Sequence, residues 1–557
     1  MVKFFKIKAS GFLILANGIM LAIILNQLAQ IYFFRLDLTE EKRFTIKQPT
    51  KDLLRSLDDV VYVEVFLEGD LNAGFRRLNS SIKDMLEEFR VYSKNKVRYN
   101  FINPTIAKGN RAQQEFILEL AKKGIQPKSV IDQKDGQRTE QLVFPGAILS
   151  YGGSEKGIML LKGNMTQGAQ SVLNQSIEGL EFEFASAIQD LTGTNRKNIA
   201  WIEGHGELDN INGASLLQAL RQSYNVFKIN LTEKPELKKF DLVIIAKPTQ
   251  RFAEDDIYRI DQYLIHGGKL LMMIDVIGVN MDSVNNGEFF AFPNDLGLEN
   301  SFFKYGVRIN NDLVQDRVSL LVPIKTDNSQ MTQIEWPFFP LINHYAEHPA
   351  TRNLDASVLK YTSSIDTVKA LGIKKTPLLF SSGYSRKISA PIKISFNDLR
   401  KEINPENFSK GPFAMGYLLE GKFTSVFKNR FLPERVDTTN FSIVDKEGKL
   451  IVISDGDVAQ NSINLQTGRP QELGFDNYSK RIFANQDLLM NIVAWLEDDS
   501  GIINARSREV EIRPLDKEKI KRKDFWQVIN LALPLLLLSL IGIAKTYFRM
   551  RKYGIVK

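Results

Sequence analysis

Two long apolar stretches lie near the ends of this chain, and apolar positions alternate with polar ones in the region between them. The first stretch covers 11–34, with no charged residue between Lys8 and Arg35, and the second covers 525–546. As a helix, each is long enough to cross the ~30 Å hydrocarbon core of a bilayer. The pattern predicts two transmembrane helices that flank a large folded region.

We interpret the first stretch as an uncleaved anchor. A cleaved signal needs a short apolar run that ends at a small-x-small site, and here the pair Ala16 and Gly18 would cut the helix in half. Gly18, Ala22, Asn26 and Gln30 follow a strict spacing of four, which predicts a face that packs against another helix. Equally, Asn26 and Gln30 fit the outer membrane interface.

The short tails set the predicted orientation. Residues 1–10 and 547–557 are basic and contain no acidic residue, so the positive-inside rule places both in the cytoplasm and about 36–522 outside. Much of the net charge of +8 lies beside the apolar stretches, which favours membrane lipid as the partner. No nucleic-acid-binding motif is present, so we expect no nucleic-acid partner.

The first part of the outer region reads as a small α/β domain. Strand patterns at 60–68 and 97–102 enclose a helical pattern at 75–92, and a strand–helix–strand unit of this kind predicts a parallel pair. A further helix at 111–122 and hairpins over 129–161 complete a layout that we expect to be thioredoxin-like.

The second part reads as a doubly wound sheet. Apolar strands at 198–202, 242–246 and 269–274 alternate with helical patterns. A later apolar strand at 450–454 is predicted to return to the same sheet, which makes 281–445 an insertion or a third, β-rich module.

The fold class predicted is therefore α/β, with two α/β domains and two flanking transmembrane helices. The predicted segments are a cytoplasmic tail (1–10), transmembrane helix 1 (11–34), an extracytoplasmic α/β domain (36–165), a linking helix (166–196), the doubly wound α/β domain (197–280 and 446–500), the β-rich insertion or third module (281–445), a juxtamembrane strand and basic linker (501–524), transmembrane helix 2 (525–546) and a second cytoplasmic tail (547–557).

Polar side chains follow the predicted strands directly. Open parallel sheets bind ligands at the carboxyl ends of their strands, and the residues that we expect at that edge are Glu203, His205, Glu207, Lys247, Asp275, Asp455 and Asp457. One interpretation is a polar crevice for a sugar, a peptide or a cation. The other is that these are turn residues and helix caps, positions that Asp and Gly favour.

Nucleotide chemistry finds no support in the motifs. The run 163–168 has the glycine spacing of a phosphate loop, but Ala169 and Gln170 follow it, so the required Lys is missing. The dinucleotide fingerprint also fails, because Asp209 stands where its third glycine belongs.

Thiol and zinc chemistry are equally unsupported. The chain has no cysteine, which removes disulfides and cysteine nucleophiles. His344 to His348 match the H-x-x-E-H pattern, which requires a helix, but Pro349 disfavours helical backbone at His348. No G-x-S-x-G elbow is present. We therefore predict no metal site, no cofactor and no catalytic residue.

Several runs, in order along nearly the whole chain, resemble GldG, the gliding-motility-associated ABC transporter accessory family of Bacteroidota-type bacteria. The runs are 35–44 (RLDLTEEKRF), 69–78 (GDLNAGFRRL), 173–188 (LNQSIEGLEFEFASAI), 204–207 (GHGE), 336–341 (WPFFPL) with 348–349 (HP), 451–457 (IVISDGD) and 504–508 (NARSR). The resemblance implies a role beside a GldA-like ATPase and a GldF-like multi-span permease, in gliding motility and protein secretion. It also implies the bacterial cytoplasmic (inner) membrane, with a large periplasmic domain. For the doubly wound domain, the resemblance implies a glutamine-amidotransferase-like α/β fold.

The leading hypothesis is a non-catalytic subunit of an ABC-type complex. Its ectodomain would bind an envelope protein or glycan, or relay ATP-driven movement outward. The alternative is a stand-alone envelope hydrolase or ligand receptor that uses the polar crevice.

Overall fold

The chain forms two compact units, Met1–Arg508 and Glu509–Lys557. The computed structural model describes residues 13, 16–21, 23–24, 45–104, 110–134, 137–162, 168–193, 196–233, 236–279, 288–325, 331–396, 405–464, 466–507 and 523–553.

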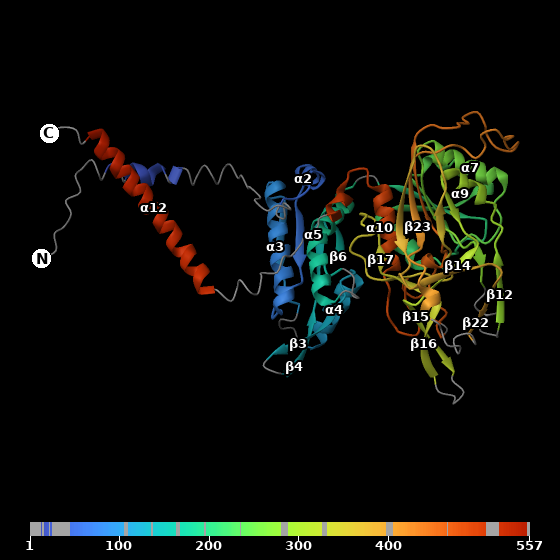
Figure 1. The fold of residues 1–557 in the computed structure, drawn as a ribbon, viewed down its shortest axis with the longest axis horizontal. Coiled ribbons are helices and arrows are strands. Elements are labelled where there is room, and N and C mark those ends of the chain that lie inside the picture. The colour runs from blue at the N-terminus through green and yellow to red at the C-terminus, as the bar shows by residue number, and fades with distance from the viewer. Residues whose placement is uncertain are drawn as a thin grey trace. The chain divides into compact units, whose positions relative to one another are not determined.

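A four-stranded sheet, ordered β2-β1-β5-β6, organises the first part of the larger unit (Figure 1). Strand β1 (Val61–Val65) pairs in parallel with β2 (Val97–Phe101), which confirms the predicted parallel pair. Strands β5 (Gly146–Tyr151) and β6 (Ser154–Met159) extend the sheet in antiparallel fashion. The smaller elements around it are α2 (Gln48–Arg55), α4 (Asn110–Lys122), β3 (Lys128–Lys134) and β4 (Gln137–Val143).

Two helices share a hydrophobic core with this sheet. Helix α3 (Ala73–Tyr92) begins at Asn72, whose side chain accepts a hydrogen bond from the first turn. Helix α5 (Ala169–Thr192) covers the segment expected to be a linking helix, but it packs into the same core. Phe184 of α5 meets Phe89 of α3 edge to face, with ring centroids 6.2 Å apart. Helix α5 is therefore a structural part of the first domain, because its apolar side chains fill that domain's core.

An eight-stranded sheet, ordered β17-β20-β23-β24-β10-β9-β7-β8, forms the second part. Five neighbouring strands are parallel, namely β7 (Asn198–Glu203), β8 (Asn225–Asn230), β9 (Leu242–Ala246), β10 (Lys269–Met273) and β24 (Glu447–Ile453). The predicted return of the late apolar strand is confirmed, since β24 pairs with β10. In chain order the parallel strands run 2-1-3-4-5, so the direction of winding switches between β7 and β9.

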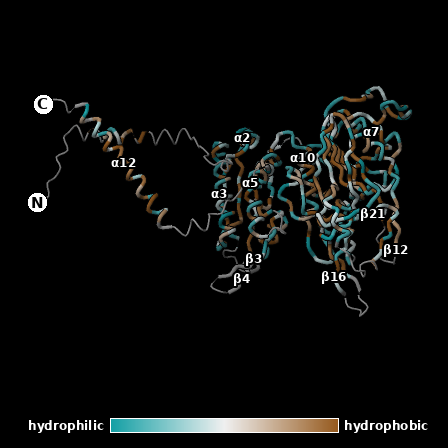
Figure 2. The backbone as a smooth tube through the Cα atoms, viewed as in Figure 1, coloured by the Kyte–Doolittle hydropathy of each residue, from teal (hydrophilic) through white to brown (hydrophobic). Residues whose placement is uncertain are grey.

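Helices cover both faces of the parallel strands. Successive side chains of a strand point to opposite faces, so Trp201 enters a core with α6 (Ala214–Ser223) and α10 (Asn485–Glu497). Its neighbour Ile202 enters a second core with α7 (Glu254–Ile265). Figure 2 shows the hydrophobic strands between these layers.

The region 281–445 contributes directly to the central sheet. Its antiparallel strands β17 (His344–Tyr345), β20 (Ile373–Phe380) and β23 (Ala414–Lys422) extend that sheet beyond β24. This arrangement argues against a separate third module. Because β17 is a strand, the H-x-x-E-H run is not a helix, as the sequence predicted.

Around these strands lie β11 (Ile277–Gly278), β12 (Glu288–Pro293), α9 (Glu299–Tyr305), β13 (Val307–Ile309), β14 (Asp312–Asp316), β15 (Ser319–Lys325), β16 (Met331–Ile342), β18 (Ser357–Val358), β19 (Ile365–Thr367), β21 (Ser385–Ser389) and β22 (Ile392–Ser395).

The juxtamembrane strand expected from residue 501 onward does not form in the described residues 501–507. A short 3-10 helix, η7 (Ile502–Ser507), occupies this position. It buries Ile502, Ile503 and Ala505 in the core of the first domain, and this spacing does not alternate as a strand would.

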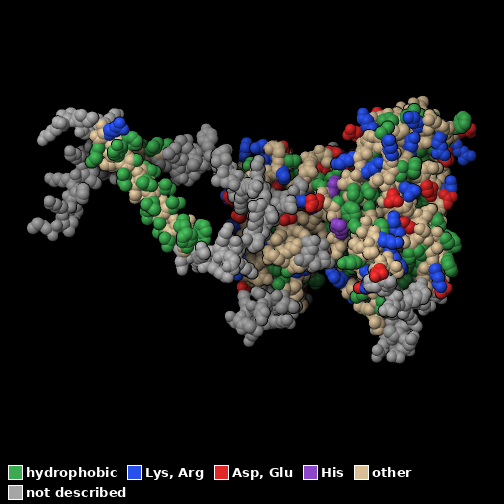
Figure 3. Space-filling view, in the orientation of Figure 1, with side chains coloured by type: hydrophobic (Ala, Val, Ile, Leu, Met, Phe, Trp, Pro, Cys, Tyr) green, Lys and Arg blue, Asp and Glu red, His purple; other side chains and the backbone are tan. Residues whose placement is uncertain are grey.

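The smaller unit contains helix α12 (Lys523–Tyr553). Within it, Phe525–Phe548 is the one helical stretch of the described chain that is long and apolar enough to cross a bilayer. Its 24 residues span about 36 Å, and Figure 3 shows apolar side chains along it.

The first predicted span remains a prediction. Gly18 is described and helical, but Ala22, Asn26 and Gln30 of the predicted packing face lie outside the described residues.

Candidate functional site

The residues predicted at the carboxyl edge of the parallel strands fall into three groups instead of one crevice. Glu203 forms an ion pair with Lys228 of the neighbouring strand β8. His205 and Glu207 form a second group, and Asp275, Asp455 and Asp457 form a third. At the predicted edge of the sheet, these residues therefore make their ion pairs in separate groups.

His205 lies in a sealed ionic cluster. Its Nε2 lies 3.1 Å from Asp256 on α7, and its Nδ1 lies 3.3 Å from Glu207. The imidazole ring stacks on Phe252, with centroids 3.9 Å apart. Burial alone would lower the pKa of His205, but the hydrogen bonds and the charges of both carboxylates outweigh it and raise the pKa to about 9.

The turn that carries His205 fills the switch point between β7 and β9, where an open sheet of this order commonly binds its ligand. The backbone N–H groups of Thr249 and Gln250 both donate to the carbonyl of His205, at 2.9 and 2.8 Å. Gly206 has a φ of +73°, and a Cβ there would lie 2.1 Å from the Thr249 hydroxyl. These close contacts leave no space for a ligand at this point.

Lys247 is the centre of the third group. Its Nζ donates to Asp457 at 2.5 Å and to Gln460 at 2.7 Å, and it lies 3.6 Å from Asp275. One oxygen from each of Asp275, Asp455 and Asp457 lies within 4.8 Å of the other two. Three carboxylates at this spacing could hold a cation, and the lysine ammonium supplies that positive charge.

The aspartates of this group also fix the backbone around them. Asp275 accepts a hydrogen bond from the N–H of Gly456 at 2.6 Å. Asp455 accepts from the N–H groups of Asp457 and Lys360 at 2.7 and 2.6 Å. The interpretation of these residues as turn-forming groups therefore has direct structural support.

Burial and crowding shift the protonation of this group. Burial raises the pKa of Asp275 to about 6 and raises that of Asp455 well above its usual range. Burial alone would lower the pKa of Lys247, but attraction to Asp457 and Asp275 raises it.

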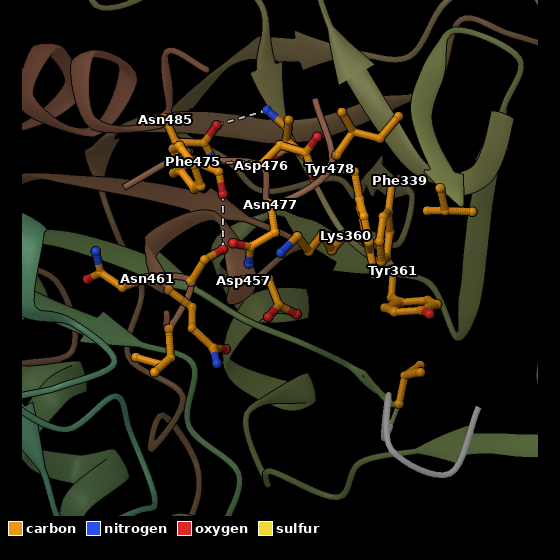
Figure 4. A pocket seen from close by; sticks show the side chains of 18 of the residues that line it. Phe339, Lys360, Tyr361, Asp457, Asn461, Phe475, Asp476, Asn477, Tyr478 and Asn485 are labelled. Carbon is orange, nitrogen blue, oxygen red and sulfur yellow. Dashed lines mark hydrogen bonds between the residues drawn. The ribbon is translucent and has the colours of Figure 1, made fainter. Parts of the chain in front are cut away.

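A cavity of about 550 Å³ opens beside Lys247 and Asp457 (Figure 4). We call it the sheet-edge cavity. Its other walls include β15, β16, β18 with the segment that follows it, and the connection between β24 and α10. Its charged and aromatic lining residues are Lys247, Phe339, Lys360, Tyr361, Asp457, Phe475, Asp476 and Tyr478.

Most of this lining was missed by sequence reasoning. The prediction followed the ends of parallel strands, whereas Phe339 and Lys360 come from the region of antiparallel strands. One sequence signal could have helped. Between β24 and α10 the chain makes a long connection, in whose described residues, 460–464 and 466–484, we find only isolated bridges. Such long connections are frequently functional.

Comparison with known proteins identifies the family. A family described as "ABC-type uncharacterized transport system" matches residues 196–492, more than half of the chain. The chain belongs to this family. It is thus an accessory protein of an ABC transport system, and the apolar helix α12 indicates membrane association. A second match, to a domain of unknown function, covers residues 40–150.

One relative is similar over nearly the whole chain. An uncharacterized protein of Borreliella burgdorferi is 22% identical over 538 residues, which cover 94% of each chain.

Two solved structures give weaker similarities. The mmIFT52 N-terminal domain is 14% identical and has a TM-score of 0.30, covering 57% of this chain and 100% of its own. An exo-β-1,4-mannosidase from Opitutaceae bacterium strain TAV5 is 10% identical and has a TM-score of 0.18, covering 69% and 45%. Neither score is high enough to assign a shared fold.

Proposed function

We propose that this chain is the non-catalytic, membrane-anchored subunit through which an ABC-type complex reaches the extracytoplasmic space. In this proposal both chain ends lie in the cytoplasm, and two terminal helices contact a GldF-like permease that works with a GldA-like ATPase. The ectodomain recognises an envelope component or relays ATP-driven movement to it. Gliding motility and secretion are the processes that the sequence resemblance implies.

One observation supports the relay. The start of α2 and the 3-10 helix η7, which lead toward the two terminal apolar stretches, both bind the same turn of α5. Before α2, the N–H of Lys47 donates to Glu181 at 2.6 Å, and the Thr50 hydroxyl donates to the same oxygen at 2.8 Å. In η7, Arg506 binds Glu183 at 3.3 Å. Movement of either segment would therefore act on α5 at one place.

Helix α5 also connects this place to the central sheet. Near its carboxyl end, Asp190 binds Lys156 of β6 and Ser223 of α6. The chain then enters β7 within a few residues. This supports α5 as the element that would transmit movement between the two sheets.

The thioredoxin-like and amidotransferase-like assignments remain part of this proposal, with helix α5 assigned to the first domain. They predict that the two α/β regions act as recognition or relay modules without catalysis.

Co-purification tests the complex. A tagged full-length chain, extracted from native membranes in mild detergent, should bring down a multi-span permease and an ATPase in a fixed ratio. As a matched control, replacing α12 by an unrelated apolar helix should keep the chain in the membrane but lose the permease. Recovery of the chain alone from native membranes would refute the proposal.

The cysteine-free sequence allows a direct test of orientation. Tyr384 is exposed in the larger unit, and Arg551 lies near the end of α12. A membrane-impermeant maleimide should label a Tyr384→Cys variant in intact spheroplasts. It should label an Arg551→Cys variant only after the membrane is opened. The reverse pattern would place the ectodomain on the cytoplasmic side.

A second candidate function, a ligand receptor, is favoured by the sheet-edge cavity. Of the three clustered carboxylates only Asp457 lines it, so Asp275 and Asp455 do not face a bound ligand as a paired acid and base would. This favours binding over the hydrolase alternative. A receptor role is compatible with an accessory subunit whose ectodomain recognises an envelope component.

A further inference from the structure

The polar groups of the sheet-edge cavity divide into engaged and open ones. The side-chain amides of Asn461 and Asn485 form hydrogen bonds within the protein. In contrast, neither the Asn477 side chain nor the Lys360 ammonium makes a hydrogen bond with the described residues. The Lys360 ammonium lies 5.7 Å from the Phe339 ring centre. Figure 4 shows Lys360 and Asn477 pointing toward each other inside the cavity.

The open groups include both donors and acceptors. Gln460 uses its carbonyl oxygen to accept from Lys247, which leaves its NH₂ group available. Asp457 uses one carboxylate oxygen for Lys247, which leaves the other. Together with the Asn477 amide and the Lys360 ammonium, they would suit a ligand that both donates and accepts hydrogen bonds.

The formal charges that line the cavity cancel. The cations are Lys247 and Lys360, and the anions are Asp457 and Asp476. A lining with balanced charge creates little field to attract a strongly charged ligand. The lining contains a single glycine, Gly474, so it offers no glycine-rich loop of the kind that cradles phosphate groups. The cavity therefore favours a neutral ligand over a nucleotide.

Aromatic rings and aliphatic side chains form the remaining walls. Phe339 and Tyr361 meet edge to face, with centroids 5.1 Å apart, and Phe475 and Tyr478 stand on the connection between β24 and α10. Ligand sites combine such apolar faces with a few placed polar groups. A sugar ring has the matching structure, because its C–H face is apolar and its rim carries hydroxyls that donate and accept.

We propose that the sheet-edge cavity binds a neutral saccharide, one or two sugar rings of an envelope glycan. A ring would stack on Phe475 and Tyr478, the more exposed rings of the lining, while Lys360, Asp457, Gln460 and Asn477 bind its hydroxyls. The volume of about 550 Å³ lies within the ~300–1,000 Å³ range of small-molecule sites. This inference rests on the proposed recognition role of the ectodomain and names the chemistry recognised.

An extended peptide is the competing occupant. Peptide recognition by strand addition uses the free backbone edge of a sheet. The cavity instead lies beside β9 and β24, which are both paired on two sides, and it offers side chains for recognition. These features favour the saccharide.

Ligand-observed NMR on the full-length chain in lipid nanodiscs tests the inference. The probes are the neutral disaccharides N,N′-diacetylchitobiose, cellobiose, maltose and mannobiose, with tri-alanine and ATP as comparators. We expect saturable binding of at least one disaccharide. Failure of all four disaccharides, or tighter binding of tri-alanine or ATP, would overturn the inference.

Matched variants locate the binding. Asn477→Ala and Lys360→Met should each weaken binding about tenfold, the loss of roughly one hydrogen bond. Asn440→Ala and Tyr384→Ala change exposed residues outside the lining and should leave affinity unchanged. Unchanged affinity in both cavity variants would overturn the assignment, and the unfolding midpoints of all four variants would verify folding.

The outcome is separable from that of the proposed function. Co-purification with the permease and ATPase depends on assembly in the membrane, so an assembled complex without saccharide binding would refute only this inference. Saccharide binding by a chain that never assembles would refute only the proposed function.

Discussion

Two ionic clusters lie at the carboxyl edge of the same parallel sheet, and only one reaches a cavity. The His205 cluster is sealed by α7 and by the turn after β9, with His205 itself 4% exposed. The Lys247 cluster has Asp455 fully buried beneath it, while Lys247 and Asp457 line the sheet-edge cavity.

The difference shows that strand ends alone do not define a ligand site. The switch point between β7 and β9 is occupied by the protein's own backbone hydrogen bonds. The cavity lies farther along the sheet, where residues 460–484 leave space above β24. We therefore assign a stabilising role to the first cluster and a place in the binding surface to the second.

The largest effect should come from Lys247. A Lys247→Met variant leaves Asp457 and Asp275 without their shared ammonium, and loss of one partner of a buried pair costs about 3–5 kcal/mol. Urea unfolding of the full-length chain in detergent, followed by intrinsic tryptophan fluorescence, to which the buried Trp201 and Trp336 contribute, measures it. A loss below about 1 kcal/mol, the range of exposed pairs, would contradict this account of the cluster.

The pH dependence of stability should separate the two clusters. The pKa of His205 is raised to about 9 in the folded state, above an unfolded value of ~6.5. Its stabilisation, at most about 3 kcal/mol, is complete below about pH 6.5 and is lost as the pH rises through 9. The pKa of Asp275 is raised to about 6 in the folded state, above an unfolded value of ~3.9. Its stabilisation is therefore complete below about pH 4 and is lost as the pH rises from about 4 to 6.

Unfolding midpoints measured from pH 4 to 10 should therefore fall in two stages. A His205→Leu variant serves as the control, because it should abolish the upper stage and keep the lower one. An upper stage that survives in this variant would assign it to another group.

At pH 6, His205→Leu should lower the free energy of unfolding by about 2 kcal/mol. This loss is smaller than the one expected for Lys247→Met. Asp256 keeps its ion pair with Arg259 at 2.7 Å, and Glu207 still accepts from the backbone N–H of residue 205 at 2.7 Å. Urea midpoints compare the two variants, and saccharide binding by the His205 variant should be unchanged. Loss of binding there would mean that the sealed cluster and the cavity are coupled.

The smallest effect on stability should come from the open cavity residue Asn477. Because its side chain makes no hydrogen bond with the described residues, Asn477→Ala should change stability by no more than about 0.5 kcal/mol. The same urea experiment measures it. A larger loss would show that this amide is structural and would weaken its assignment to ligand binding.

Local patterns were sufficient for many elements. The apolar run at 242–246 is strand β9 with the same bounds, and the helical pattern at 75–92 corresponds to α3. Both succeed because the periodicity of 2.0 or 3.6 is a property of the local backbone. The prediction of strand at the start of 501–524 failed, because η7 follows the shape of the core that it fills.

The site was predictable only in part. Asp275, Asp455 and Asp457 were predicted from their position after strands, and the structure brings them together. Lys360 and Asn477 carried no such signal, since their role depends on segments far apart in the chain.

The sequence by itself determined the parallel strands, the apolar helix α12, the absence of thiol chemistry and the absence of a phosphate loop. These follow from residue type, local spacing and composition. Tertiary structure alone decided which charges are sealed, which line a cavity and that α2 and η7 both meet α5. Such contacts depend on the packing of distant segments, and no short-range pattern encodes that packing.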